Sequence, residues 1–574
     1  MAGFHIEHFG CRAARADGEA IAGNLRAMSE LEPFAADVVI VNTCSVTAEA
    51  DRAARAFIRR THRKNPAAKI VVTGCYAQRA PEELAAMAGV AAVVGNSHKA
   101  LAPEIILNLT RESDLTRGAG LAASEPPRLV PVASLLAASA RQFSVGAAQA
   151  PVSTPIWAPI WAPIWADDRF AHSFIEDVHW GEPQPAVGAQ TRPNLKIQEG
   201  CGNRCTFCVI PFTRGPSQSL PYAVVMRRVE SFVAAGGKEL VLSGINLGRW
   251  GRDFVVQNEV LWSRALSAEK SGKDGARIED KQAHGAFEFS TLSAEKSGKD
   301  GAREIAEERN WSPTLANAQR TRIVEGGAPA QGGAPADSLA GLVRKILEET
   351  ALPRLRLSSI EPMDWDDALI ALMREFGGGR LARHAHLPLQ SGSDAVLRRM
   401  HRRYRPWHYA GKVAALLGAA GPDLTLGADV MVGFPGETDA EFEETLAFIR
   451  ALPFGYLHLF PFSARPGTRG WALHQASPVP QAATQERMAA LRALAAEKSE
   501  THRRRFVGRE LEAITLHTQA ALAEQRCTTA LTENFLPVAI EGRFAANRLL
   551  RVRVNALNDD GALKCEAARA ALAQ

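Results

Sequence analysis

The chain has few cysteines, no long apolar run and only a small excess of charge. Its 574 residues include eight cysteines, far fewer than a disulfide-stabilised scaffold of this size requires. No stretch approaches the roughly 18 unbroken apolar residues of a membrane-spanning helix. The first residues, MAGFHIEHFG, lack the basic segment and apolar core of a secretory signal. We therefore expect a cytoplasmic protein with reduced thiols and no membrane partner.

What is present is the composition of an ordinary globular protein. Apolar residues make up 46% and charged residues 22% of the chain, which excludes a wholly disordered or fibrous protein. The formal net charge of +5 is compatible with a nucleic-acid partner but does not require one. At roughly 150 residues per domain, the length allows three or four domains.

The first hundred residues alternate strand and helix patterns. Apolar and β-branched runs predict strands at Phe4–Phe9, Val38–Val41, Ile70–Thr73 and Ala92–Val94. Helical patterns lie between them at Asp17–Leu31, Val46–Arg63 and Pro81–Met87. This alternation is typical of a parallel sheet with right-handed crossovers. We predict an N-terminal parallel α/β domain over residues 1–118.

Two segments of unusual composition interrupt this order. Residues 119–190 are rich in Ala and Pro and hold three copies of Pro-Ile-Trp-Ala, beginning at Pro155, Pro159 and Pro163. A proline at every fourth position opposes both helix and sheet ladder, so we predict a linker. Residues 253–337 contain the same twelve letters twice, at Leu266–Arg277 and Leu292–Arg303. The unit has almost no apolar residue to bury, which indicates a solvated insertion.

The order returns on both sides of the second segment. Strand patterns recur at Glu239–Leu242, Leu355–Leu357, His386–Leu389, Leu424–Val432 and Gly455–Leu459. Joined across the insertion, residues 191–252 and 338–476 predict a parallel α/β barrel or part-barrel. A connecting helix over 477–505 and a small β-barrel over 506–570, with a strand at Leu549–Val554, complete the predicted fold.

Three cysteines lie close together at the start of this second region. Cys201, Cys205 and Cys208, the loop trio, form a C-x3-C-x2-C run, and thiolates so spaced can converge on one metal centre. An iron–sulfur cube takes four ligands, so three thiolates leave one iron open to bind something else. The alternative is structural zinc. It needs a fourth ligand, and no Cys or His lies within the next roughly seventy residues.

Three further cysteines are separated along the N-terminal domain. Cys11, Cys44 and Cys75, the strand-end trio, each lie just past the carboxyl end of a predicted strand, 33 and 31 residues apart. In an open parallel sheet those ends share one edge, where ligands bind. We therefore expect a second cluster there, the alternative being three buried core cysteines. Cys527 and Cys565 have no comparable setting, and we assign them no function.

The C-x3-C-x2-C run resembles that of the radical S-adenosylmethionine enzymes, and the two trios together resemble the methylthiotransferase family within them. The segments Leu355–Pro362, His386–Asp394, Asp429–Thr438 and His458–Thr468 look like motifs of that family, and the tail resembles a TRAM domain, an RNA-binding β-barrel. Lys196–Cys201, Lys238–Asn246 and Ser358–Glu361 are most similar to the subgroup that modifies N6-threonylcarbamoyladenosine beside the tRNA anticodon. One departure is Ala14, where relatives often have Asn.

The resemblance implies a tRNA methylthiotransferase with two [4Fe-4S] clusters and S-adenosylmethionine. In this interpretation the loop-trio cluster starts the radical chemistry, and the strand-end-trio cluster holds the sulfur that is donated. It also implies a monomer that uses a reductant such as flavodoxin or ferredoxin. A sister interpretation changes the substrate to isopentenyladenosine of tRNA or to an aspartate of a ribosomal protein. An alternative of another class is a non-catalytic RNA-binding protein with structural zinc.

Contacts to the cofactor and to RNA follow from the same interpretation. Phe207 takes the place that the superfamily gives to an aromatic residue near adenine. The other candidates for cofactor contact fall near the carboxyl ends of predicted strands: Ser243, Ser358, Gln390 and Asp429. The candidates for RNA phosphates are basic residues in two runs: Arg402, Arg403, Arg405, Arg548, Arg551 and Arg553. Solvated surfaces carry such arginines too, and the tail from residue 506 has eight basic and eight acidic residues.

Overall fold

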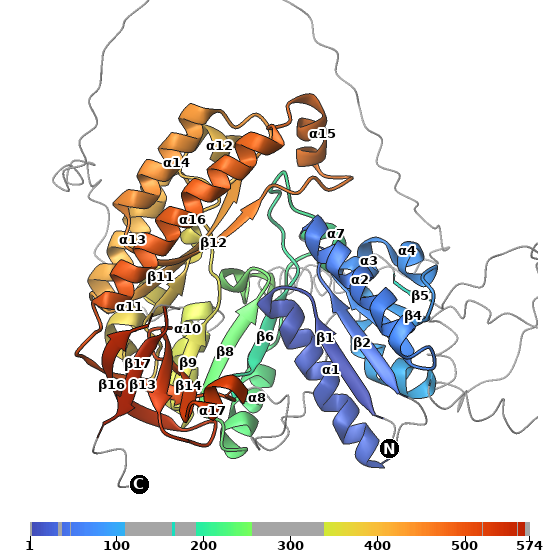
Figure 1. Cartoon of the computed structure of the whole chain (residues 1–574), viewed down its shortest axis with the longest axis horizontal. Helices are drawn as coiled ribbons and strands as arrows, with labels where there is room; N and C mark the ends of the chain where they lie inside the picture. The colour runs from blue at the N-terminus through green and yellow to red at the C-terminus, as the bar shows by residue number, and fades with distance from the viewer. Residues whose placement is uncertain are drawn as a thin grey trace, which may run out of the picture. The chain divides into compact units, whose positions relative to one another are not determined.

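The computed structural model describes residues 3–31, 37–45, 47–109, 164–166, 191–254, 338–518, 520–558 and 561–568. They form an α/β chain with parallel sheets and a small closed β-barrel at the C-terminal end (Figure 1). The predicted class is therefore confirmed. The two repeats at Leu266–Arg277 and Leu292–Arg303 lie outside the described residues. No helix among those described is long and apolar enough to cross a membrane.

The N-terminal sheet is parallel throughout, with the order β1-β2-β3-β4-β5. Its strands are β1 (Phe4–His8), β2 (Val38–Thr43), β3 (Lys69–Gly74), β4 (Val90–Gly95) and β5 (Ile164–Trp165). Its helices are α1 (Arg12–Leu31), α2 (Ala48–Lys64), α3 (Cys75–Arg79), α4 (Pro81–Ala85) and the 3-10 turn η1 (Asn96–Leu101). The predicted alternation of parallel strands and helices is confirmed, with α1 beginning five residues earlier than expected. The predicted domain bounds 1–118 stay a prediction.

Alternation along the strands gives this sheet two apolar faces, as a parallel sheet covered on both sides requires. Ile40 and Val71 pack with Ile21 and Leu25 of α1 on one face. Val41, Ile70 and Val72 pack with residues of α2, α3 and α4 on the other. Packing on both faces holds the strands in their pairing register. This register fixes where the residues that follow each strand lie.

The third Pro-Ile-Trp-Ala copy contradicts the expectation that these repeats cannot join a sheet. Ile164 and Trp165 form β5, which pairs in parallel with Val93 and Val94 of β4. β5 is the edge strand of the sheet, the position where a neighbouring proline in the sequence is tolerated. The other two copies lie outside the described residues.

The second region holds two sheets. One has the order β7-β6-β8-β9, in which the short edge strand β7 is antiparallel to β6 and the other pairs are parallel. The other has the order β10-β11-β12 and is parallel. The strands are β6 (Asn194–Glu199), β7 (Gln218–Ser219), β8 (Glu239–Gly244), β9 (Arg354–Leu357), β10 (His384–His386), β11 (Thr425–Val432) and β12 (Phe454–Pro461). Backbone hydrogen bonds join them, from Ala382 N to Leu355 O at 2.9 Å and from Ile360 N to His386 O at 3.0 Å. The strands follow the predicted order, with β10 beginning two residues earlier than predicted. A barrel or part-barrel formed by them stays a prediction.

Helices cover these sheets in the order of the chain. They are α7 (Ile210–Arg214), α8 (Tyr222–Ala234), η2 (Leu247–Arg249), α10 (Leu339–Glu349), η3 (Pro362–Asp364), α11 (Asp367–Phe376), α12 (Asp394–Arg399), α13 (Pro406–Ala420), α14 (Asp439–Ala451) and α15 (Arg469–Ala476). Local signals set their ends. Thr438 and Glu441 form a capping box at α14, and the side chains of Ser338 and Asp366 cap α10 and α11.

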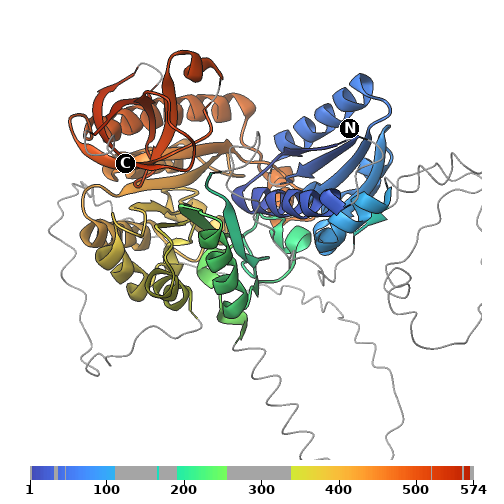
Figure 2. The same ribbon diagram turned by 90° about the horizontal axis from the view of Figure 1, so that it is seen from below.

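The long helix α16 (Gln481–Arg504) connects this region to the C-terminal barrel. The barrel closes in the order β13-β14-β15-β17-β16 and is drawn in red in Figure 2. Its elements are β13 (Glu510–Thr515), α17 (Ala520–Glu524), β14 (Cys527–Thr532), β15 (Pro537–Glu541), β16 (Leu549–Leu557) and β17 (Leu563–Ala567). Cys565 is buried in its core, where burial raises the pKa of the thiol to about 12, and Cys527 opens β14.

Candidate metal centres and their surroundings

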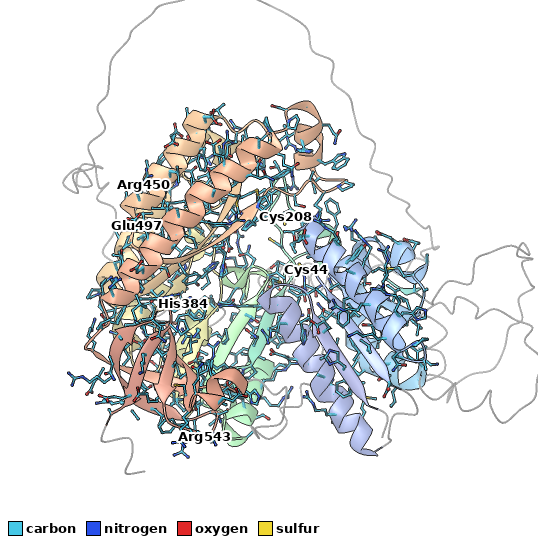
Figure 3. The ribbon with its side chains drawn as sticks, viewed as in Figure 1. Cys44, Cys208, His384, Arg450, Glu497 and Arg543 are labelled. Carbon is cyan, nitrogen blue, oxygen red and sulfur yellow. The ribbon has the colours of Figure 1, made fainter. Side chains whose placement is uncertain are left out.

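The loop trio follows strand β6 directly. Gly200 turns the chain out of the strand with φ +68°, and a Cβ there would lie 1.8 Å from Pro216 O, so only glycine fits. The Cys201 N–H donates to Gly215 O at 3.1 Å and the Cys208 N–H to Cys205 O at 3.2 Å. The loop is thus folded back on itself between β6 and α7. Figure 3 labels Cys208, the last thiol of this trio.

The three thiols of the loop lie close enough to influence one another. Burial, with Cys205 and Cys201 nearby, raises the pKa of the Cys208 thiol to about 12. Burial also raises the pKa of Cys201, and Cys205 adds to that effect. The raised pKa values of Cys201 and Cys208 mean that these two thiols need a nearby cationic centre to become thiolates together.

Donors for such thiolates are in place around the loop. The backbone N–H of Asn203 donates to Cys201 Sγ and that of Ile210 to Cys208 Sγ, both at 3.4 Å, and Asn246 Nδ2 lies 3.6 Å from Cys201 Sγ. Arg402 Nη1 donates to Cys205 Sγ at 3.2 Å, while Nη2 of the same side chain donates to both carboxylate oxygens of Glu361. N–H donors to sulfur are the means by which proteins set the potential of iron–sulfur clusters.

This placement corrects the expectation for Arg402. Its side chain is buried, with its guanidinium held by Glu361 and Cys205, so it does not face solvent as a contact to RNA phosphates must. The neighbouring Arg403 is exposed as expected. Arg405 is half-buried, and its Nε lies 3.2 Å from Asp394 Oδ1.

The strand-end trio lies where three parallel strands end. Thr43 and Gly74 are paired in the register of β2 and β3, so Cys44 and Cys75 leave neighbouring strands side by side. Gly10 precedes Cys11, and a Cβ on it would lie 2.9 Å from Cys44 Cβ and 3.6 Å from Cys44 Sγ. The structure therefore brings Cys11 toward the other two, at the sheet edge that the sequence predicts. Figure 3 labels Cys44.

Cys75 receives two side-chain donors. Asn96 Nδ2 lies 3.4 Å from its Sγ, and Arg214 Nε lies 3.2 Å away. Arg214 comes from α7, just after the loop trio, and its charge also interacts with Cys11. Arg214 Nη2 and Asn96 Oδ1 are buried without any hydrogen-bond partner among the described residues. Buried polar atoms normally have hydrogen-bond partners, so unpaired ones beside a thiol fit a site that binds a polar group.

Ala14 has a small local consequence. Its side chain is buried, and its backbone carbonyl accepts a hydrogen bond from Asn42 Nδ2 near the end of β2. A Cβ on Gly10 would lie 3.2 Å from Ala14 Cβ, so this side chain packs beneath the turn that carries Cys11. The carbonyl rather than the side chain makes the hydrogen bond at this position.

A buried ionic network connects the surroundings of the two trios. Asp17 of α1 pairs with Lys99, Lys196 and Arg214, and Glu199 of β6 pairs with the same three cations. Burial alone would raise the pKa of Asp17, yet the three cations hold it below its ordinary value, and they hold that of Glu199 well below. Burial lowers the pKa of Lys99 to about 8. Glu199 precedes the loop trio by two residues, so one network touches both sites.

The sequence alone does not predict these buried ion pairs. Lys196 and Glu199 stand in a strand whose other members include the apolar Leu195 and Ile197, and charged residues buried in a strand require partners. That signal indicates a buried ion pair but does not identify Asp17, Lys99 or Arg214, which come from three other elements. Only the fold brings them together.

The residues expected to contact the cofactor lie on or after strands of the two sheets of the second region. Ser243 of β8 and Ser358, just after β9, are buried, and Phe207 packs against the same core. Gln390 has φ +63°, and its N–H donates to the Asp429 carbonyl at 2.7 Å. Ser243 Oγ and Gln390 Oε1 are buried without a partner among the described residues, so these two positions fit a polar ligand. Their roles remain predictions.

The tail arginines are on the outside of the C-terminal barrel. Arg548, Arg551 and Arg553 are exposed. Arg551 stands opposite Glu512, and Arg553 opposite Glu510 and Glu566, in the registers of neighbouring strands. Acidic neighbours reduce the local positive charge, so the barrel presents mixed charge rather than a basic stripe.

Neither trio is arranged around a single metal ion. Among the residues that the structure describes, no three side chains of His, Cys, Asp or Glu converge as one ion requires. A structural zinc site brings four ligands within about 2.3 Å of one centre. A cube of several irons is larger, and each of its corners takes one thiolate.

Comparisons with known proteins are consistent with this geometry. Two family models match: the Uncharacterized protein family UPF0004 over residues 3–95 and the Radical SAM superfamily over residues 321–449. The first contains the strand-end trio. The second begins after the loop trio, at residue 321.

Relatives are similar over nearly the whole chain. Threonylcarbamoyladenosine tRNA methylthiotransferase MtaB of Treponema pallidum (strain Nichols) is 29% identical, covering 98% of this chain and 100% of the relative. That of Bacillus subtilis (strain 168) is 28% identical, covering 88% and 82%. The tRNA-2-methylthio-N(6)-dimethylallyladenosine synthase of Syntrophotalea carbinolica is 26% identical, covering 82% and 78%.

A solved structure is also similar in part. The radical S-adenosylmethionine methyltransferase TsrM from Kitasatospora setae aligns with 13% identity and a TM-score of 0.35, covering 74% of this chain and 63% of that one. Similarity at this level establishes neither the fold nor the function of the present chain.

Proposed function

The chain belongs to the radical S-adenosylmethionine methylthiotransferases, and we propose that it adds a methylthio group to C2 of N6-threonylcarbamoyladenosine at position 37 of tRNA. The observation that carries the proposal is the pair of thiol trios, each at the carboxyl ends of parallel strands and each with an arginine N–H on one sulfur. Relatives named for this reaction, of similar length, support it.

The residues at both trios fit iron–sulfur clusters. Cys201, Cys205 and Cys208 would hold one cluster, and Cys11, Cys44 and Cys75 a second. When bound, these groups would supply the electron that cleaves S-adenosylmethionine and the sulfur that is transferred, chemistry that side chains alone cannot perform. The chain's own contribution is to present the thiolates, stabilise their charge and exclude water.

The described residues divide these tasks clearly. Arg402 and Asn246 donate to the loop trio, and Arg214 and Asn96 donate to the strand-end trio. Ser243, Gln390 and Asp429, with Phe207, would contact S-adenosylmethionine beside the loop trio. The buried network of Asp17 and Glu199 holds α1 against β6, which keeps the two trios at a constant separation.

The proposal includes tRNA as substrate and the C-terminal barrel as a TRAM-like RNA-binding domain. Arg403 and the exposed arginines Arg548, Arg551 and Arg553 would contact phosphates, each adding to the salt dependence of binding. The target adenosine would be splayed out of the anticodon loop to reach the sulfur. A flavodoxin or ferredoxin as reductant, a monomeric state and a cytoplasmic location belong to the same proposal.

Mass spectrometry of tRNA nucleosides tests the substrate. A strain lacking the gene should lose the methylthio derivative of threonylcarbamoyladenosine, and the wild-type gene should restore it while a Cys205→Ala gene should not. Loss of methylthio-isopentenyladenosine instead would replace our substrate with that of the sister enzymes. A protein purified without oxygen that is colourless and carries zinc would contradict the proposal altogether.

A further inference from the structure

A cluster of four arginines lies beside the strand-end trio and has too little negative charge around it. Arg192 and Arg356 pair with Glu239 at 3.0 and 2.8 Å, and Arg354 pairs with the same carboxylate at 3.3 Å and also with Glu512. The fourth member is Arg12. Glu239 is fully buried, and burial is outweighed by Arg356 and Arg192, so its pKa falls to about 2.

Arg12 differs from the other three. Its guanidinium has no hydrogen bond or ion pair to any residue that the structure describes. It lies over the Phe535 ring, 5.3 Å from Cζ to the centroid. Burial lowers its pKa, and the nearby Tyr456 and Asp429 only partly offset that effect. A partly buried guanidinium without a hydrogen-bonded carboxylate is costly, because its five N–H donors lose water and gain no acceptor.

The surroundings of Arg12 hold further donors without acceptors. Arg356 is fully buried with Nη1 unpartnered, and His384 is buried with Nδ1 unpartnered, among the described residues. The Phe535 ring lies 5.4 Å from Arg356 Cζ and stacks on the His384 ring at 4.2 Å. Arg12 and Arg356 therefore meet around one aromatic ring with unused N–H capacity, and the unpartnered Nδ1 of His384 lies beside the same ring. An anion is the ligand that such a set accepts.

Phe535 is itself held in an unusual conformation. It has φ +69° in the turn between β14 and β15, a region that costs a non-glycine residue energy. The turn is tied down by Glu533, which pairs with Arg383 at 2.5 Å, and by Asn534 Nδ2, which donates to Asp423 O at 3.1 Å. The C-terminal barrel thus holds this ring in place against the arginines.

We infer that Arg12 binds the carboxylate of the threonylcarbamoyl group and thereby selects this substrate over adenosines whose N6 substituent carries no charge. The inference rests on the proposed function. A guanidinium matches a carboxylate with two parallel hydrogen bonds. Arg12 is also the residue next to Cys11, so the side chain that reads the N6 substituent adjoins a thiol that would hold the donated sulfur. In adenine only N1 separates C2 from the carbon that bears N6.

Binding of two RNAs tests the inference without relying on turnover. The probes are a fluorescent anticodon stem-loop that carries threonylcarbamoyladenosine and the same RNA with the threonyl carboxylate converted to its methylamide. The full-length, cluster-reconstituted protein should bind the acid about tenfold more tightly than the amide, the size expected for one charge-assisted pair. Arg12→Gln should reduce that ratio to about one, without changing the affinity for the amide.

Arg26→Gln is the matched control. Arg26 lies on the same helix and also over an aromatic ring, with Cζ 5.9 Å from the centroid of Phe4, but outside the arginine cluster. This variant should keep the wild-type ratio. Arg12→Lys, which keeps the charge but loses the paired geometry, should give an intermediate ratio.

The outcomes separate the two claims. An Arg12→Gln protein with full iron content that still prefers the acid overturns the role of Arg12. So does a wild type that methylthiolates the acid RNA but binds both RNAs equally. A wild type that neither prefers nor methylthiolates the acid RNA removes the proposed substrate, and the inference with it. If Arg12→Gln binds no iron, the test uses the wild type and Arg12→Lys instead. The ratio of their affinities for the acid and the amide RNA then decides whether Arg12 binds the carboxylate.

Discussion

The loop trio lies within eight consecutive residues, whereas the strand-end trio is collected from three places between Cys11 and Cys75. The first depends on one turn after β6 and on Arg402 from a distant segment. The second depends on the register of β1, β2 and β3 and on Arg214, which follows the loop trio in sequence. Similar thiol sites are thus built in one case by local spacing and in the other by sheet topology.

The largest effect should come from removing either trio. Replacing all three cysteines of one trio by alanine should reduce iron from about eight to about four atoms per chain, since each cube holds four irons. Both variants should lose methylthiolation. Only the strand-end variant should still cleave S-adenosylmethionine, which liquid chromatography of 5′-deoxyadenosine measures. A chain with unchanged iron in either variant would contradict the assignment of that trio.

The next effect separates local from topological construction. Gly200→Ala places a Cβ 1.8 Å from Pro216 O, and Gly74→Ala, where φ is +98°, places one 2.3 Å from Thr43 O. Gly200→Ala should cost most of the loop-trio iron and leave the N-terminal domain stable. Gly74→Ala should cost the other cluster and also lower the melting temperature, because it disturbs the β2–β3 pairing.

Iron analysis and circular dichroism check this pair together. Gly202→Ala is the control, since a Cβ at Gly202 meets nothing within 4 Å. It should keep both clusters and the wild-type melting temperature. Equal losses of stability in Gly200→Ala and Gly74→Ala would show that the two sites depend on the fold to the same degree.

A smaller effect concerns the two arginines on sulfur. Arg402→Met and Arg214→Met each remove a charged N–H donor from one trio. The loss of that donor destabilises the reduced cluster, because the reduced cluster is the more negative state. Each should lower the reduction potential of its own cluster by roughly 60 mV, the equivalent of a tenfold change for one electron. The potential of each cluster is measured in chains that keep only one trio. A shift of the strand-end cluster by Arg402→Met, or of the loop cluster by Arg214→Met, would reverse the pairing of arginine and site.

The smallest effect concerns the contact that joins the two sites. Burial raises the pKa of Glu19 to about 7, and its Oε2 accepts from the Asn194 N–H at 3.1 Å between α1 and β6. A raised pKa stabilises the folded state at low pH, so this contribution should be present below pH 4.5 and lost as pH rises through 7.

Glu19→Gln should remove that pH dependence. Its melting temperature should exceed that of the wild type by a few degrees at pH 8 and match it near pH 5. Glu49→Gln is the control, because Glu49 is exposed on α2. A wild type whose stability is flat between pH 5 and pH 8 would contradict the raised pKa of Glu19.

The sequence predicts the central strands of the N-terminal sheet but not the burial of Arg402 or the edge strand β5. The strands Val38–Thr43 and Lys69–Gly74 were predictable because uninterrupted β-branched runs are buried on both faces. The burial of Arg402 does not follow from the sequence, because a run of arginines has no burial signal of its own. The strand Ile164–Trp165 does not follow either, because the surrounding prolines predict a linker and only the fold makes these two residues the edge of a sheet.

The sequence by itself determined the alternation of strands and helices and the positions of six thiols, because hydrophobic periodicity and short spacings are local. The tertiary structure alone decided what surrounds those thiols. Arg214 meets Cys75, Asp17 meets Lys196, and Arg12 meets Phe535 across long separations in the chain. Such contacts follow from the packing of whole elements against one another, and charged side chains are selected there by their partners rather than by their neighbours in sequence.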